Sequence, residues 1–196
     1  QMDEGNVLNS VLKADVGNII NTLEEIDQKQ FEGAVNAVLN AKNIYVMGVR
    51  SASALSAFAG FYFNLLFENV RVVNENSVSE VFEQILRIGK NDVFIGLSFP
   101  RYSKRIINAV EYAGSKRADV VALTDSVQSP IAEYADHLLI AQSDMASFVD
   151  SLVAPLSIIN AMIVAVSRRK QEELTKRLQA LEEVWDRYDV YDKKHG

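Results

Sequence analysis

A three-layer α/β/α fold around a five-stranded parallel sheet is predicted by two features of the sequence. Five short apolar segments alternate with segments in which apolar residues recur at helical spacing. The central apolar segment, 93–97, contains no charged residue, as expected of a strand that is buried on both faces. Strands that alternate with helices in this way form a parallel sheet with right-handed crossovers and with helices on both faces.

The expected elements follow one another at regular spacing along the chain. Two helices come first, over 5–28 and 31–41. The strands are expected at 44–49, 70–73, 93–97, 119–123 and 138–141, and the helices between them at 54–67, 81–86, 102–114 and 129–135. Five strands with these connections favour the flavodoxin-like order 2-1-3-4-5, in which ligands bind between the ends of strands one and three.

A long apolar segment, 146–166, follows the last strand. Its length would suffice to cross a bilayer, but polar residues such as Asp150 and Asn160 interrupt it. We therefore expect a buried helix, from about Ser147, that packs on its own sheet and on a second subunit. The next segment, 168–191, is a charged amphipathic helix whose apolar stripe serves either internal packing or a dimer surface.

Composition limits the number of domains and the kinds of partner. With 196 residues, 48% of them hydrophobic and 23% charged, the chain is expected to form one folded domain at 29–196 behind an N-terminal helical linker segment at 1–28. There is no cysteine, and His137 and His195 lie far apart, so neither a metal site nor a cofactor is expected. The lack of cysteine and of a recognisable signal peptide favours the cytoplasm. A net charge of −6 argues against nucleic-acid binding by this chain alone.

Two loops carry the residues that we assign to a ligand site. Ser98 ends the central strand and Ser103 lies at the N-cap of the next helix, where free N–H groups and the helix dipole favour an anion such as phosphate. The loop 50–53 follows the first strand and meets the other loop at the switch point of the sheet. Serine at an N-cap is also ordinary in proteins without a ligand there, so both interpretations stay open. The predicted ligand-binding residues are Arg50, Ser51, Ser53, Ser98, Arg101, Tyr102 and Ser103.

Four segments at fixed intervals resemble one protein family. They are GVRSASAL from Gly48, LSFPRYSK from Leu97, VVALTDSVQSPIAEYADHLL from Val120 and SFVDSLVAPLSIINA from Ser147. Together they resemble the sugar isomerase (SIS) domain, and in particular the C-terminal SIS domain of RpiR-type bacterial transcription regulators. The resemblance implies a domain that binds a phosphosugar or a related anionic metabolite and forms a homodimer or higher oligomer. It also implies DNA binding through an N-terminal helix-turn-helix domain that is missing from this chain.

Both loops depart from the family pattern. The family's phosphate loop is usually Ser-x-Ser-Gly-x-Thr, whereas here Pro100 replaces the second serine, Arg101 the glycine and Ser103 the threonine. In the first loop Arg50 takes the place of a glycine, and Ala52 that of a serine found in close relatives. Two hydroxyl groups are lost and two guanidinium groups are gained. A phosphosugar bound in a different way and another anion, such as a carboxylate, both remain open.

Two other functions compete with an effector-binding domain. A stand-alone phosphosugar aldose–ketose isomerase needs a general base beside its ligand. The candidates for that base are Glu75, Glu80, Glu83 and Asp150. Each is better explained as a solvent-facing or helix-terminal carboxylate. A purely structural oligomerisation module explains the lost hydroxyl groups but not the two loop arginines. We therefore expect an effector-binding domain that is not an enzyme.

Overall fold

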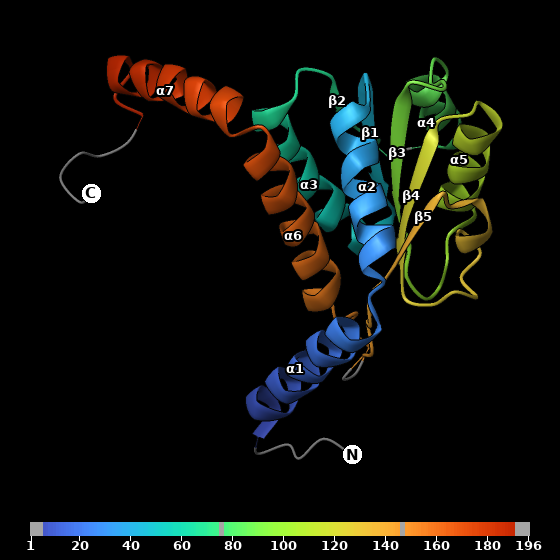
Figure 1. Ribbon diagram of the computed structural model, residues 1–196. Coiled ribbons are helices and arrows are strands. Elements are labelled where there is room, and N and C mark those ends of the chain that lie inside the picture. Colours follow the sequence, from blue (N-terminus) through green and yellow to red (C-terminus); the bar gives the residue numbers. More distant parts are fainter. Residues whose placement is uncertain (1–5, 75–76, 146–147, 191–196) are drawn as a thin grey trace.

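Five parallel strands form one sheet in the order β2-β1-β3-β4-β5 (Figure 1). The strands are β1 (Asn43–Gly48), β2 (Val70–Val72), β3 (Asp92–Leu97), β4 (Asp119–Thr124) and β5 (His137–Ile140). The strand order is the predicted one, and every strand lies within one residue of its predicted bounds. The computed structural model describes residues 6–74, 77–145 and 148–190.

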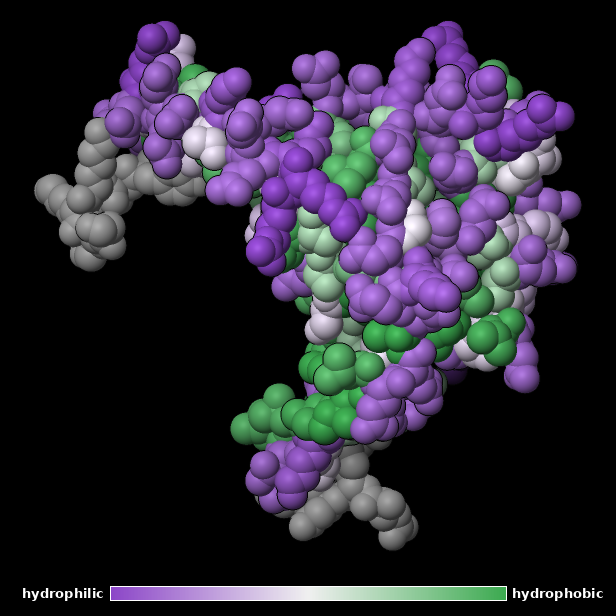
Figure 2. All heavy atoms as spheres, viewed as in Figure 1, coloured by the Kyte–Doolittle hydropathy of each residue, from purple (hydrophilic) through white to green (hydrophobic). Residues whose placement is uncertain are grey.

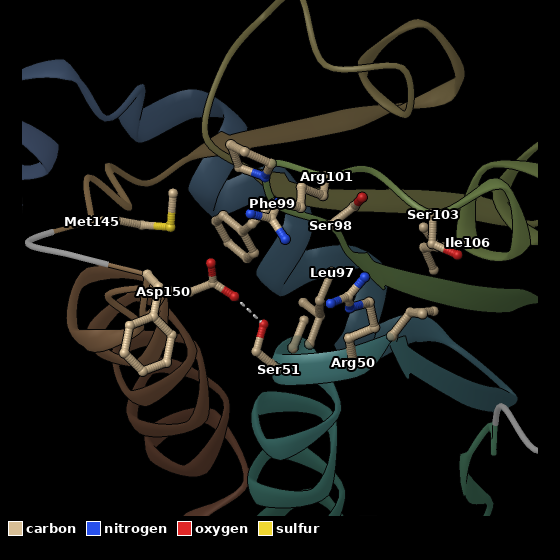
Figure 3. Close-up of a pocket in the computed structure, with 14 residues that line it drawn as sticks. Arg50, Ser51, Leu97, Ser98, Phe99, Arg101, Ser103, Ile106, Met145 and Asp150 are labelled. Atoms are coloured by element: carbon tan, nitrogen blue, oxygen red, sulfur yellow. Dashed lines mark hydrogen bonds between the residues drawn. The ribbon is translucent and has the colours of Figure 1, made fainter.

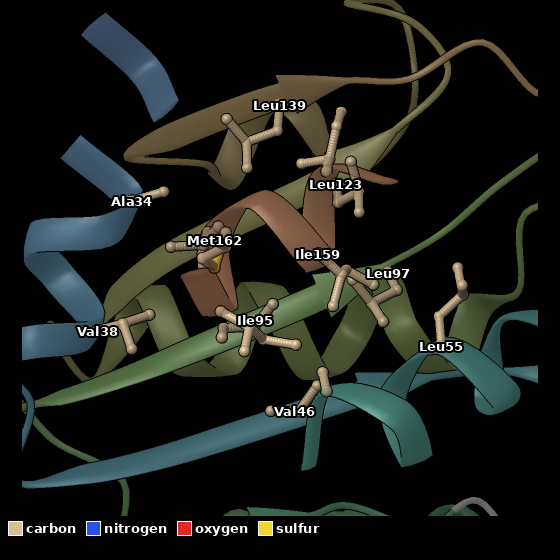
Figure 4. Packing of buried hydrophobic residues seen from close by; sticks show 14 of the residues in the cluster. Ala34, Val38, Val46, Leu55, Ile95, Leu97, Leu123, Leu139, Ile159 and Met162 are labelled. Atoms are coloured by element: carbon tan, nitrogen blue, oxygen red, sulfur yellow. The ribbon is translucent and has the colours of Figure 1, made fainter. Parts of the chain in front are cut away.

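Helices cover both faces of the sheet, because successive side chains of a strand point to opposite faces. In β1, Val46 packs into one core and Met47 into the other. Figure 4 shows the first core, in which Val38 and Met162 meet the strands. The helices over this core are α2 (Gln28–Asn40), α3 (Ser53–Leu66) and α6 (Val153–Arg169), and those over the other face are α4 (Val78–Ile85) and α5 (Lys104–Ser115). The predicted three-layer fold is therefore confirmed.

The parallel strands bring several loops to one edge of the sheet. Gly48 at the end of β1 lies opposite Leu97 at the end of β3, and Leu97 lies opposite Leu123 of β4. The N–H group of Ser98 still donates to the carbonyl oxygen of Leu123 at 3.1 Å, so Ser98 continues the strand by one residue. The loops after β1 and β3 therefore start side by side, as the strand order predicts.

The long helix after the sheet begins later than predicted. α6 begins at Val153 rather than near residue 147, which lies outside the described residues. Asp150 is held in the preceding loop because its carboxylate accepts a hydrogen bond from the hydroxyl of Ser51. Phe148 is 86% exposed, so the apolar residue that extended the helical pattern belongs to the loop instead. None of the described helices is both long and apolar enough to cross a membrane.

Two of the smaller sequence predictions need adjustment. The helix predicted at 129–135 is only a short 3-10 turn, Ala132–Tyr134. The C-terminal helix α7 (Gln171–Arg187) begins directly after α6 and contains no buried residue. Figure 1 shows that α7 extends away from the sheet, so its apolar stripe contributes little to the core of this chain.

The N-terminal helix α1 (Val7–Glu25) also projects from the sheet (Figure 1). Its C-terminal half is tied to the loop after β5: the side-chain amide of Asn18 donates to the carbonyl oxygen of Asp144 at 3.1 Å, and the hydroxyl of Thr22 accepts from the N–H group of Gln142 at 2.8 Å. Several large apolar side chains of α1 are exposed, among them Leu8, Val16 and Leu23, and Figure 2 shows hydrophobic residues beside hydrophilic ones on its surface. α1 is thus anchored at one end and exposed along its length.

Candidate functional site

A cavity of about 80 Å³ lies at the carboxyl edge of the sheet, between the loops that follow β1, β3 and β5 (Figure 3). Five of the seven residues that the sequence predicted line this cavity. They are Arg50, Ser51, Ser98, Arg101 and Ser103. The other lining residues are Val49, Ala52, Leu97, Phe99, Pro100, Ile106, Met145, Phe148 and Asp150. The two serine-containing loops therefore line one cavity together, as the sequence analysis expected.

The loop after β1 forms a tight 3-10 turn, Arg50–Ala52, that leads into α3. A Cβ atom on Gly48 would lie 2.1 Å from the carbonyl oxygen of Ala52, so the turn folds against the strand end at a distance that only glycine allows. Ser53 lies outside the cavity lining, because its hydroxyl turns back and donates to the carbonyl oxygen of Arg50 at 2.6 Å. The hydroxyl of Ser51 faces across the cavity and donates to the carboxylate of Asp150 (Figure 3).

The loop after β3 carries a buried hydroxyl group that no described residue contacts by a hydrogen bond. Ser98 is 3% exposed and lines the cavity, and its Oγ has no hydrogen-bond partner among residues 6–74, 77–145 and 148–190. An unsatisfied buried polar group costs about 1–3 kcal/mol, so native proteins rarely keep one without a use for it. Ser103 is the N-cap of α5, and its Oγ accepts from the N–H group of Arg105 at 3.3 Å. Ser98 therefore carries, at the cavity lining, a hydroxyl group that none of the described residues uses.

The two loop arginines share an unusual backbone conformation. The φ angle is 59° at Arg50 and 62° at Arg101, in the left-handed region that favours glycine. A residue with a side chain in this region costs about 1–2 kcal/mol. Among the described residues, the guanidinium of Arg101 has neither a hydrogen-bond partner nor an ion-pair partner. A strained backbone that directs an unpaired charge into a cavity is typical of functional sites.

Tyr102 is the second predicted residue that lies outside the cavity lining. Its hydroxyl donates to the carboxylate of Asp125 at 2.8 Å, in the loop after β4. Burial, and then the hydrogen bond with Asp125, raise the pKa of Tyr102 to about 12, so the phenol stays protonated at neutral pH. Tyr102 thus ties the loop after β3 to the loop after β4 instead of lining the cavity.

A third loop contributes residues that the sequence analysis did not assign to the site. Asp150, Met145 and Phe148 reach the cavity from the loop between β5 and α6. The sequence had favoured a helix-terminal role for Asp150. The position of this loop could have been inferred from the topology, because β5 ends at the same edge of the sheet as β1 and β3.

Candidate general bases are sparse around the cavity. Among the described residues Asp150 is the one carboxylate in its lining, while Glu80 and Glu83 lie on α4 and Glu75 lies outside the described residues. His137 begins β5 and packs against Gly33 of α2, where a Cβ atom would lie 2.4 Å from its Nδ1. Within the described residues no three His, Cys, Asp or Glu side chains gather to hold a metal ion.

Comparison with known proteins agrees with this architecture. Residues 38–165 match the family model described as SIS domain. An uncharacterized HTH-type transcriptional regulator of Caldanaerobacter subterraneus is 25% identical over 170 residues, which are 85% of this chain and 60% of that protein. Another from Haemophilus influenzae is 30% identical over 139 residues, which are 70% of this chain and 48% of that protein. The chain therefore spans only about half of the length of these curated relatives.

Two solved structures with the same fold illustrate the likeness. The sugar isomerase domain of an RpiR transcription factor from Sphaerobacter thermophilus superimposes with a TM-score of 0.85 at 26% identity, covering 90% of this chain and 98% of that one. The Vibrio vulnificus NanR protein, complexed with ManNAc-6P, superimposes with a TM-score of 0.81 at 18% identity, covering 94% of this chain and 70% of that one. At 18% identity the second likeness shows the fold alone.

Proposed function

The chain belongs to the SIS domain family, and we propose that it is the effector-binding, oligomer-forming part of an RpiR-type DNA-binding transcription regulator. In this proposal the cavity binds a sugar phosphate or a related anionic metabolite. DNA is contacted by a helix-turn-helix domain outside these 196 residues. The observation that carries the proposal is the buried hydroxyl of Ser98, in a cavity that is also lined by Arg101; among the described residues neither of these two polar groups has a partner.

The relatives support the assignment of the chain to a transcription regulator, and the residues that line the cavity support an anionic ligand. The curated relatives are described as HTH-type transcriptional regulators, one similar structure is of an RpiR transcription factor, and another is of the NanR protein complexed with ManNAc-6P. In this chain the hydroxyl of Ser98, the guanidinium of Arg101 and the N-terminus of α5 converge on one hollow. All three favour negative charge, and a phosphate oxygen can accept from each of them.

A melting-temperature screen tests the anion site. Sugar phosphates, N-acetylated amino-sugar phosphates and sugar acids are added to the chain, and a ligand of the folded state raises its melting temperature. Ser98→Ala should weaken binding by about 0.5–1.5 kcal/mol, or by up to about 3 kcal/mol if the acceptor is charged. Arg101→Ala should weaken it at least as much, because guanidinium–phosphate pairs are often bidentate.

Arg117→Ala is the matched control for this screen. Arg117 is exposed and has a φ angle of 63°, like Arg101, but it follows α5 at the far end of that helix and does not line the cavity. Its replacement should leave the ligand-induced rise intact. If Ser98→Ala and Arg101→Ala respond to a stabilising ligand as the unaltered chain does, the ligand binds elsewhere.

We propose that the domain performs no catalysis. Asp150 is the single carboxylate in the described lining of the cavity at Ser98; of the two further carboxylates in the adjoining hollow, Asp125 accepts from Tyr102 and Asp144 is exposed. Aldose–ketose isomerisation needs a base at the substrate's C1 and C2 protons. Incubation with hexose and pentose phosphates should therefore give no interconversion of aldose and ketose. Turnover that disappears in Asp150→Asn would establish the isomerase instead.

We also propose that the chain forms a homodimer through its projecting helices. α1 leaves Leu12 and Val16 more than half exposed, and an apolar hollow of about 230 Å³ lies where α1, α2 and α6 meet. A second copy would remove this surface from water. Light scattering at tens of micromolar should give a dimer, and Leu12→Glu with Val16→Glu should give a monomer. Asn21→Glu, an exposed polar site on the same helix, is the control and should remain dimeric.

A further inference from the structure

Asp150 gives the candidate site a second chemical character. It lies half-buried in the loop between β5 and α6, and its carboxylate faces the cavity that receives Arg50 and Arg101 (Figure 3). Among the described residues its carboxylate accepts a hydrogen bond from the exposed hydroxyl of Ser51. A carboxylate is an acceptor only. The cavity wall formed by Asp150 therefore favours a hydrogen-bond donor and disfavours a second anion.

More hydrogen-bond acceptors line a neighbouring cavity on the other side of Asp150. A second cavity, of about 120 Å³, is lined by Pro100, Asp125, Gln142, Ser143, Asp144, Met145 and Asp150. It shares Pro100, Met145 and Asp150 with the cavity of the serine loops, so the two hollows adjoin at these residues. Three carboxylates line the second hollow, and two arginines line the first. The combined space is polarised, with a donor-rich end at Ser98 and an acceptor-rich end past Asp150.

We propose that the two hollows form one binding site, with Asp150 at their junction. Asp150 sets the specificity for the part of the ligand that lies away from the phosphate: it favours an uncharged or amine-bearing group there. This inference rests on the proposed anion site. The phosphate group lies against Ser98 and Arg101, and a hydroxyl or protonated amine of the same molecule donates to the carboxylate of Asp150, which has room to accept from Ser51 as well. The favoured ligands are monophosphates of neutral or amino sugars. Phosphorylated sugar acids, which carry a second anion, are rejected because their carboxylate meets the acidic end.

Calorimetric titration with matched probes tests the proposal. The probes are inorganic phosphate, a panel of hexose and pentose monophosphates that includes glucose 6-phosphate and glucosamine 6-phosphate, and the sugar acid 6-phosphogluconate. The best sugar monophosphate should bind at least about tenfold more tightly than inorganic phosphate, since one hydrogen bond to a charged group gives a factor of this order. 6-Phosphogluconate should bind no more tightly than inorganic phosphate does.

Asp150→Asn separates the two ends of the site. The substitution keeps the shape of the side chain and an oxygen that can accept from Ser51, but it removes the charge. Affinity for the best sugar monophosphate should fall about tenfold, affinity for inorganic phosphate should stay within about twofold, and affinity for 6-phosphogluconate should rise. Asp144→Asn, which alters only the second hollow, should give a smaller loss for the sugar monophosphate alone. Glu111→Gln removes one charge from the exposed surface of α5 and should leave the affinities for the sugar monophosphate, inorganic phosphate and 6-phosphogluconate unchanged.

The outcomes distinguish this inference from the proposed function. If inorganic phosphate binds and Asp150→Asn weakens phosphate and sugar monophosphates equally, or weakens neither, Asp150 does not select the ligand. The inference is also overturned if no sugar monophosphate binds more tightly than phosphate, or if 6-phosphogluconate is the best ligand of the unaltered chain. If Arg101→Ala leaves phosphate binding unchanged, the anion site itself is misplaced, and the proposed function fails with it.

Discussion

The loops after β1 and β3 look alike in sequence and differ in what their side chains do. Each follows a buried strand, carries an arginine with a left-handed backbone and opens a helix. In the first loop both hydroxyl groups have partners within the protein: Ser53 donates to its own turn and Ser51 donates to Asp150. In the second loop neither the buried hydroxyl of Ser98 nor the guanidinium of Arg101 has a partner within the described part of the chain.

This difference shows that residue types at a strand–helix turn do not by themselves identify a ligand contact. Serine hydroxyl groups that are satisfied inside the protein stabilise the loop. A buried hydroxyl without a protein partner costs folding energy, and an ordered water or a ligand can supply the missing partner. We therefore expect the second loop to contribute most of the affinity for the ligand, and the first loop to contribute mainly to the shape of the cavity. The following predictions test this division.

Ser98→Ala should show the largest effect on the ligand-free protein, and with an unusual sign. Burial of the unpaired hydroxyl costs about 1–3 kcal/mol, so its removal should raise the free energy of unfolding by about 1 kcal/mol or more. Ser103→Ala in the same loop should instead lower it by about 0.5–2 kcal/mol, because the N-cap of α5 is lost. Urea denaturation without ligand measures both. If Ser98→Ala instead lowers the free energy of unfolding, the hydroxyl of Ser98 already has a partner in the ligand-free protein. The serine hydroxyl groups of both loops would then be satisfied without a ligand.

Arg101→Gly should show separately how the backbone strain at Arg101 affects stability and how its guanidinium affects anion binding. Glycine relieves a left-handed backbone that costs about 1–2 kcal/mol, and the greater freedom of the unfolded chain offsets about 0.5–1 kcal/mol of that gain. The free energy of unfolding should therefore rise slightly while anion binding is lost. Arg117→Gly should give the same small rise with binding intact, because Arg117 shares the left-handed backbone outside the cavity. Destabilisation by Arg101→Gly alone would reveal contacts that the arginine makes without ligand.

Much of this fold follows from the sequence because its signals are local. The apolar runs of the strands and the helical periodicity between them give both the bounds and the order of the sheet, and the order gives the position of the switch point. The meeting of Ser51 with Ser98 is a consequence of that topology. It required no knowledge of side-chain conformation.

What the sequence could not give depends on contacts between distant segments. Phe148 fits a helical pattern but is exposed in a loop, and Asp150 is kept out of α6 by Ser51, 99 residues away in sequence. Arginine gives no local signal of a left-handed backbone, as glycine would, so the strain at Arg101 is visible only in three dimensions. The same is true of Tyr102, whose turn towards Asp125 depends on the neighbouring loop.

Tyr102 should add a pH dependence that belongs to the second loop alone. Burial and the hydrogen bond with Asp125 raise its pKa from the usual 10.0 to about 12, so the folded state favours the protonated phenol. This stabilisation is fully present below pH 10 and is lost as the pH rises towards about 12. Tyr102→Phe should therefore flatten the alkaline decline of the melting temperature between these values and leave the ligand response at neutral pH largely intact. An unchanged alkaline profile would assign the decline to other groups, such as Tyr45, whose burial also raises its pKa.

Ser53→Ala should have the smallest effect of all, although the sequence placed this residue in the ligand site. Its hydroxyl is exposed and donates back to Arg50 within the turn, away from the cavity lining. Its replacement should change the free energy of unfolding by no more than about 0.5 kcal/mol, as at other surface positions. The ligand-induced rise in melting temperature should equal that of the unaltered chain, whereas Ser51→Ala, which alters the cavity wall, should reduce it. If Ser53→Ala reduces the rise as much as Ser51→Ala does, the turn opens when the ligand binds. The first loop would then donate hydroxyl groups as the second does, and the distinction between the two loops would hold only for the ligand-free protein.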